Sequence, residues 1–183
     1  MTTILTAIEA IEAFRGFLVL ALSLADDRVV YAGQEIAPEA SRPVMPYLTV
    51  LWLRSTALSS TPFVRVGDEV APEDPGGLTH EHVIQQAREG VIQVVAYGET
   101  GPTLLEQLPL LKAQLDEQKY LNDQGIAIRA AADILDTRTL RDTSYEASAM
   151  QEWAVTYAVE VVSRIGTIET VIVNTALEEP EGA

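Results

Sequence analysis

The chain has 183 residues, of which 48% are hydrophobic and 21% charged, and its 27 acidic and 12 basic residues give a formal net charge of −15. This length supports one domain with its own core, and the balance of apolar and charged residues is typical of a globular protein. The negative charge argues against a protein that holds nucleic acid on a basic surface. The lack of cysteine excludes disulfides, thiolate metal sites and a cysteine nucleophile.

The first predicted element is an amphipathic helix that begins after a capping Thr2 or Thr3 and ends near residues 25–27. Apolar residues recur at near-helical spacing over 4–22, and two glutamates lie on the opposite side. The uninterrupted apolar part, 17–25, is about half of the ~20 residues that a membrane span needs. A signal peptide has positive charge before its apolar core, whereas here only Arg15 is positive and two glutamates precede it. We therefore predict neither export nor a membrane span.

Three strands and an acidic connection are predicted next. Residues 28–33 form a short β-branched strand, and a proline-containing extended loop follows it. The longest strand, 47–58, carries apolar residues on both faces, which predicts a central position in a sheet. It and the strand 90–98 are expected to form a long antiparallel hairpin. The connection Gly67–His82 is acidic and rich in turn residues, and loops of this length are usually functional or mobile.

A second helix is predicted over 100–125, with Pro102 in its first turn and a possible kink at Pro109. Leucines spaced by three or four residues form its apolar stripe. From residue 126 the chain is expected to continue as a short strand and then a turn or short helix.

The clearest strand pattern lies near the C-terminus. From 153 to 161 one parity is large and apolar, and the other is mostly small: Ala154, Thr156 and Ala158, then Glu160. Successive side chains of a strand point to opposite faces, so this alternation indicates a half-buried strand whose small face lets another surface approach closely. That surface is either the protein's own helix or a neighbouring subunit. A turn at 164–166 and a strand over 168–173 complete a predicted terminal hairpin.

These elements predict an α+β fold with an antiparallel sheet, a long hairpin and helices packed on one side. Residues 1–177 are expected to form a single domain. The acidic end, 178–183, is predicted to be a disordered tail.

Candidate chemistry is sparse. His80 and His82 form a His-x-His pair that would place both imidazoles on one face of a strand, where Glu81 and nearby carboxylates are candidate further ligands. The pair has neither the spacing of an HExxH motif nor accompanying cysteines, so the simpler interpretation is a solvated loop. The stretch 98–103 leads into a helix N-terminus, yet it lacks the lysine of a phosphate loop and the glycine pattern of a dinucleotide site. No serine lies in a nucleophile elbow. We therefore predict no enzyme activity and no catalytic, cofactor-binding or metal site.

Three segments carry a resemblance to a known family. They are VVYAGQEIAPEASRPVMPYLTVLWL, with its RPxxPY entry into a strand; VIQVVAYGETGPTLLEQLPLLKAQL, a strand that ends in Tyr-Gly before a helix; and TSYEASAMQEWAVTYAVEVVSRIGTIETVIV, a Tyr-Glu followed by a long strand and an IETV strand. Their order and spacing over residues 1–177 resemble those of tailed-phage neck or tail terminator proteins. One departure is that Ala147 and Ser148 stand where relatives often carry arginines after the Tyr-Glu.

The resemblance implies a structural virion protein that forms a ring, typically hexameric, which caps the tail tube and joins it to the head-side connector. Its partners would be further copies of itself, the tail tube protein and the connector or adaptor protein. It would be located in the phage neck and assembled in the host cytoplasm. Genome DNA would pass through an acidic lumen without specific binding, because negative charge repels phosphate.

Other functions stay open from sequence alone. The same sheet would suit a soluble protein-binding module, and a head-completion or connector protein of the same assembly is also a small ring-forming α+β protein. A metal-dependent hydrolase built on His80 and His82 is the remaining alternative.

Overall fold

The computed structural model describes residues 6–33, 45–70, 79–141 and 144–166. Its elements follow in the order α1 (Ala7–Leu22), a 3-10 turn η1 (Asp26–Arg28), β1 (Val29–Tyr31), β2 (Tyr47–Ala57), β3 (Phe63–Val70), β4 (Thr79–Tyr97), α2 (Gly101–Leu111), α3 (Leu115–Asp123), β5 (Ile126–Ala131), β6 (Leu135–Arg141) and β7 (Ser144–Gly166).

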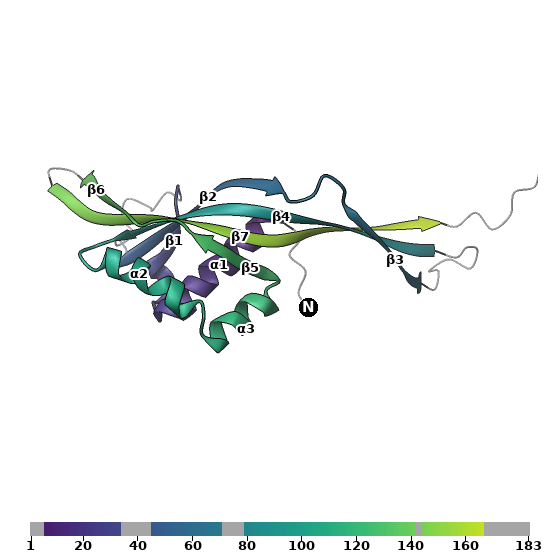
Figure 1. The fold of residues 1–183 in the computed structure, drawn as a ribbon, viewed down its shortest axis with the longest axis horizontal. Coiled ribbons are helices and arrows are strands. Elements are labelled where there is room, and N and C mark those ends of the chain that lie inside the picture. Colours follow the sequence, from purple (N-terminus) through teal and green to yellow (C-terminus); the bar gives the residue numbers. More distant parts are fainter. Residues whose placement is uncertain (1–5, 34–44, 71–78, 142–143, 167–183) are drawn as a thin grey trace, which may run out of the picture.

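One sheet of seven strands organises the molecule, with three helices packed on one of its faces (Figure 1). The main path is β1-β2-β4-β7-β5; β3 pairs with β4, and β6 pairs with β7. All pairings are antiparallel except that of β1 with β2, so the sheet is mixed. The predicted α+β class and the single helical layer are confirmed.

The two longest strands form the spine of the sheet. β4 and β7 pair along all of β4, from Thr79 opposite Gly166 to Tyr97 opposite Ser148. The predicted antiparallel pairing of the runs 47–58 and 90–98 is also confirmed, because β2 lies beside the second half of β4.

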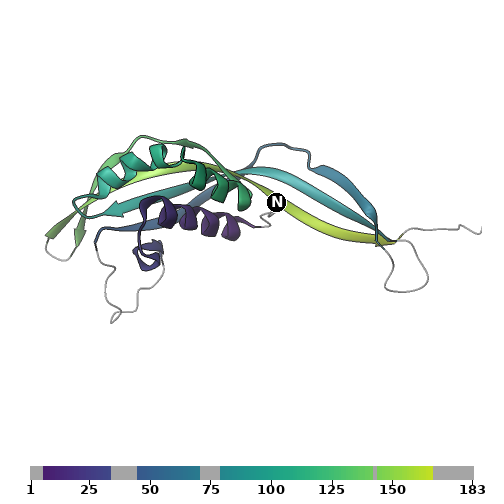
Figure 2. The same cartoon turned by 90° about the horizontal axis from the view of Figure 1, so that it is seen from below.

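Beyond the helices the spine continues as a thin extension (Figure 2). It consists of β3, the first half of β4 and residues 158–166 of β7, and we call these three strands the arm. The part of the sheet that the helices cover is the body.

The core lies between the helices and the body. Trp153, Val155 and Tyr157 are buried there, as the predicted alternation requires, and the small parity lies on the opposite face. The Trp153 ring lies 6.0 Å from that of Phe14 in α1. Each large side chain fully removed from water contributes about 1.5–3 kcal/mol, so this layer holds the helices on the sheet. The largest fully buried side chains are Trp153, Tyr47, Phe14, Phe17, Leu18, Leu48, Ile92, Leu105, Leu108, Val29, Val50 and Val94.

The caps of α1 differ in detail from the prediction. Thr6, rather than Thr2 or Thr3, is the N-cap, and its hydroxyl accepts a hydrogen bond from the Glu9 N–H at 3.2 Å. Ser23 ends the helix in the left-handed conformation, with φ of 50°.

The predicted helix over 100–125 is wrong in one respect, because it is two helices, α2 and α3. Pro109 lies inside α2, and the break falls after it, at 112–114. The segment after residue 126 is also not a turn or short helix, since it forms β5 and β6. Both strands pair with β7, whose length offers two successive partners on one edge.

Two predicted connections are in part strands. Residues 67–70 of the acidic segment belong to β3 and 79–82 to β4, so only 71–78 remain as a connection, which lies outside the described residues. The turn predicted at 164–166 is the end of β7, because β4 continues beside it and pairs with all three residues. The second strand of the predicted terminal hairpin, 168–173, and the tail 178–183 lie outside the described residues.

Candidate assembly surfaces

Segments far apart in sequence meet at the end of the body away from the arm. Tyr47 opens β2 directly opposite Tyr97 at the end of β4, and their rings stack with centroids 4.6 Å apart and planes 11° apart. The N–H of Gly98 donates to the carbonyl of Ala147 in β7 at 2.9 Å. The PY, Tyr-Gly and Tyr-Glu segments therefore belong to one structural corner.

The glycine-rich turn before α2 is a packing feature. Gly98 has φ of +105°, a conformation that favours glycine. A Cβ at Gly101 would lie 2.8 Å from the carbonyl oxygen of Ala96, so a side chain there would push the helix off the sheet. Pro102 lies in the first turn of α2, as predicted. The positive φ explains Gly98, and the close approach of strand and helix explains Gly101, so neither glycine requires a bound anion.

Position 148 has no access to solvent. Ser148 is 1% exposed, and its hydroxyl hydrogen-bonds the carbonyl and the hydroxyl of Thr137 in β6. Ala147 beside it is exposed. The arginines expected from relatives would therefore face different environments at these two positions, and only Ala147 offers a surface position.

The histidine pair lies in the arm. His80 and His82 are two residues apart in β4, at positions whose side chains are outside the described set. Among the described residues no group of three or more histidine, aspartate or glutamate side chains is arranged to hold a metal ion.

Arg15 in α1 is tied to the turn that follows this helix. Its Nε donates to the carbonyl of Val29 at 2.6 Å, and a terminal nitrogen donates to the carbonyl of Asp26 at 2.5 Å and lies 2.9 Å from an Asp26 carboxylate oxygen. The hydrogen bond and the charge of Arg15 hold the pKa of the Asp26 carboxyl below its ordinary value, and Asp26 raises the pKa of Arg15. An open hollow of about 470 Å³ adjoins this cluster, but the guanidinium is already bound within the chain.

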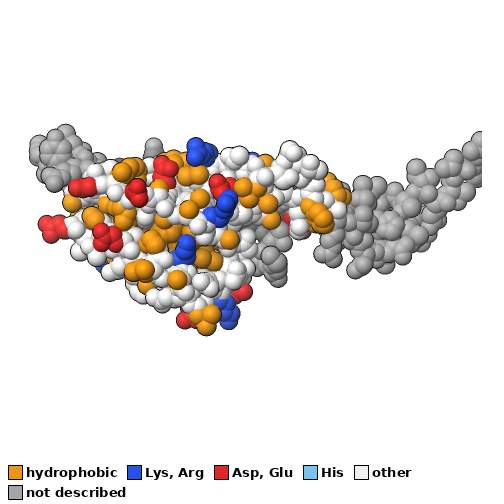
Figure 3. All heavy atoms as spheres, viewed as in Figure 1, with side chains coloured by type: hydrophobic (Ala, Val, Ile, Leu, Met, Phe, Trp, Pro, Cys, Tyr) orange, Lys and Arg blue, Asp and Glu red, His pale blue; other side chains and the backbone are white. Residues whose placement is uncertain are grey.

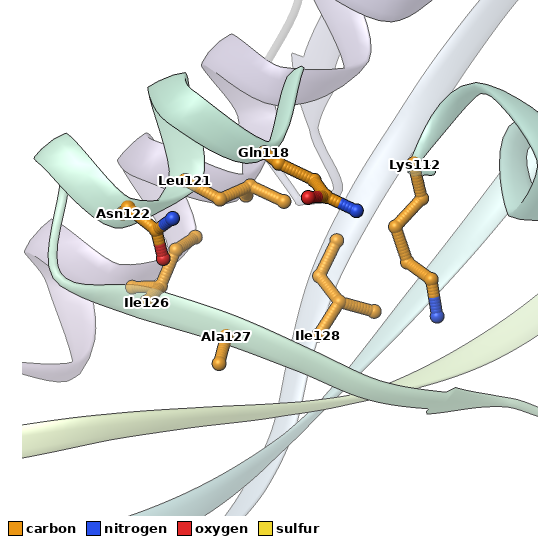
Figure 4. Close-up of a pocket in the computed structure, with 7 residues that line it drawn as sticks. All are labelled: Lys112, Gln118, Leu121, Asn122, Ile126, Ala127 and Ile128. Atoms are coloured by element: carbon orange, nitrogen blue, oxygen red, sulfur yellow. The ribbon is translucent and has the colours of Figure 1, made fainter. Parts of the chain in front are cut away.

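A second hollow lies between α3 and β5 (Figure 4). Leu121, Ile126 and Ile128 form its apolar floor, and Gln118 and Asn122 lie at its rim. Its volume of about 190 Å³ is below the roughly 300–1,000 Å³ of pockets that enclose small molecules. It is large enough to receive one side chain of a partner protein.

The face of the body opposite the helices has no covering layer among the described residues (Figure 1). The small strand positions predicted to allow close approach lie here, and Ala154 borders a shallow hollow of about 270 Å³. The three described helices all pack on the other face, so none of them covers these small positions. Leu51 and Leu53 on β2 are 38% and 42% exposed. The ion pair between Arg129 and Glu89, at 2.7 Å, places both signs of charge on this face.

The helical layer is acidic. Acidic side chains outnumber basic ones on α1, α3 and the turns beside them, and Figure 3 shows the two signs interspersed with apolar side chains over the body. No described helix is both long and apolar enough to cross a membrane.

The geometry therefore defines an α+β protein in which one face of the sheet and a protruding arm have no covering layer among the described residues. In a comparison with known families, residues 9–181 match the family described as "Phage neck terminator protein". The chain belongs to this phage neck terminator family, which indicates a structural role in the neck of the virion. A comparison with curated proteins gives no match.

Proposed function

We propose that the chain forms a ring, with six copies, that caps the tail tube at the neck and joins it to the head-side connector or adaptor. The observation that supports the proposal is the arm, a three-stranded extension that none of the described helices covers (Figure 1). A protein that functions as one copy has no use for such a surface, whereas neighbours in a ring cover it for one another.

The lumen of this ring would pass genome DNA without binding it. The formal charge of −15 on each copy supports this, because a surface that is neutral or acidic overall releases no counterions from phosphate and gains no affinity for DNA. The partners are further copies, the tail tube protein and the connector. The ring is assembled in the host cytoplasm and carries out no reaction.

Phage particles that lack the protein test the proposal. When its gene is disrupted, we expect filled heads and separate tails in lysates viewed by negative-stain electron microscopy. Purified protein added back should restore infectious particles. Joined heads and tails at normal yield without the protein would contradict the proposal.

A further inference from the structure

The arm presents two unpaired strand edges. β3 (Phe63–Val70) pairs only with β4 among the described residues, and β7 beyond Tyr157 also has β4 as its only described partner. The free part of β7, residues 158–166, is almost the same length as β3. Within the described part of the chain, the two outer sides of the arm therefore carry matching rows of backbone N–H and C=O groups without a strand partner.

The edge of β7 has neither a proline nor a bulge to prevent strand pairing, and its only charged residues are Glu160 and Arg164. Its pairing with β4 runs without a bulge from one end to the other, and 158–166 contains no proline. Soluble proteins usually protect an edge of this length with prolines, bulges or closely spaced charges. On β3 a bulge between Val66 and Glu69 leaves a regular edge from Phe63 to Val66.

The arm is also apolar on surfaces that nothing in the described chain covers. Phe63 and Val64 are 66% and 52% exposed, and Ile84 between the two outer strands is 36% exposed. Figure 3 shows hydrophobic side chains on the surface out to the end of the part of the arm whose side chains are described. Three strands need a packed hydrophobic face for stability in water, so this surface calls for a partner.

We propose that the free edge of β7 in one copy pairs with the free edge of β3 in the next copy, so that the arms build one continuous sheet. The inference rests on the proposed ring and names its contact. The two edges are different surfaces, so the contact is heterologous, and repeating it around an axis closes a ring rather than a pair.

The direction of this pairing follows from the topology. β3 and β7 are both antiparallel to β4, so they run the same way. Rotation about an axis that lies along the strands preserves their direction, and the ladder between copies is therefore parallel. A two-fold dimer through the β7 edges would instead be antiparallel, and it would leave β3 uncovered.

Disulfide trapping tests this contact in a chain that has no cysteine of its own. Val64 and Val161 both pair with Ile84, so within one copy they lie two strand spacings apart, roughly 10 Å. A disulfide requires Cα atoms within about 7 Å, so this pair can close only between copies.

The register between copies is found with three double variants. Val64→Cys is combined with Val159→Cys, Val161→Cys or Ser163→Cys, because only shifts by two residues keep the same faces together. Under mild oxidation we expect one of the three to give a covalent ladder that ends at the mass of the ring. Each single variant should stay unlinked. The matched control, Val64→Cys with Glu160→Cys, places the thiols on opposite faces and should give no ladder.

Each other outcome has a definite meaning. Covalent dimers from a single variant would show that an edge pairs with its own copy and would overturn the inference. A ring measured by light scattering in which none of the three double variants cross-links would overturn this contact but leave the ring. A chain that stays monomeric and unlinked at every concentration, both in solution and after mixing with tail tubes, would contradict both.

Discussion

Gly90 lies in the middle of β4, where the body meets the arm, and adding one carbon there should destabilise the protein. A Cβ at this position would lie 2.2 Å from Cη2 and 2.5 Å from Cζ2 of Trp52 on β2. Since carbon atoms normally approach to about 3.5–4.0 Å, the indole must move by more than 1 Å. The ring is held edge-on against Tyr157, with centroids 5.6 Å apart, so moving it also loosens that contact.

The cost of Gly90→Ala combines opposing terms. Overpacking of this kind costs about 1–3 kcal/mol, and the aromatic contact is worth about 0.5–1.5 kcal/mol. Replacing glycine by alanine in a strand otherwise gains about 0.5–1 kcal/mol. We expect a net loss of about 1–3 kcal/mol, which for a chain of this size lowers Tm by roughly 3–10 °C.

A double-mutant cycle isolates the cause. In a Trp52→Leu background the ring is absent, so Gly90→Ala should be neutral or stabilising, measured by guanidinium-induced unfolding of all four variants. An equal loss of stability in both backgrounds would refute the reasoning, because it would place the cost outside the contact with the indole.

Three further predictions follow from the other sites. Ser148→Arg should destabilise the fold by about 3 kcal/mol or more, since it forces a charge into a buried position. Ala147→Arg, on the exposed neighbour, should leave the stability measured by thermal unfolding within about 0.5 kcal/mol of the parent. Similar losses of stability in both variants would contradict the burial of Ser148. Arg15→Gln should cost about 1–3 kcal/mol at pH 7 through its lost backbone hydrogen bonds. The folded pKa of Asp26 is depressed, so the stability that its ion pair with Arg15 contributes is present above the ordinary pKa of 3.8 and is lost as the pH falls below it. The difference in stability between Arg15→Gln and the parent should therefore shrink in acid unfolding curves. A difference that stays constant with pH would argue against the ion pair. Replacing 71–78 by Asn-Gly should preserve the far-UV circular dichroism spectrum and block head–tail joining, and normal yields of infectious particles would exclude a docking role for this connection.

Sequence patterns predicted the parts of the fold where local periodicity and burial agree. The alternation from Trp153 onward requires one buried and one open face, and the structure has both. The helical spacing of α1 likewise predicted its buried stripe. In both elements the periodic pattern of apolar residues repeats over several turns or strand positions, so it predicts the structure even where a single residue departs from the pattern.

The errors arose where a distant partner decides the local structure. Residues 67–70 were assigned to an acidic connection, yet they belong to β3, which pairs with β4. Residues 164–166 read as a turn because of Gly166, but the backbone of β4 is available to pair with them. Neither pairing leaves a signal in the segment itself, since both depend on contacts far away in the sequence.

The candidate surfaces could be predicted only in part. The small face of β7 was visible in the sequence, but which layer covers it depends on where the helices pack. The free edges of the arm had no sequence signal, because an edge is defined by the absence of a neighbouring strand. The family resemblance, rather than any motif for chemistry, carried the functional prediction, and the match over 9–181 confirms the family.

The most direct test of the central claim is the mass of the assembled particle, measured by light scattering over a concentration series, with the chain alone and after mixing with tail tubes. The account predicts a particle of six copies of the 19.9 kDa chain, reached either in solution or on the tube. A particle that remains at 19.9 kDa at every concentration, with no chain bound to the tubes, would contradict it.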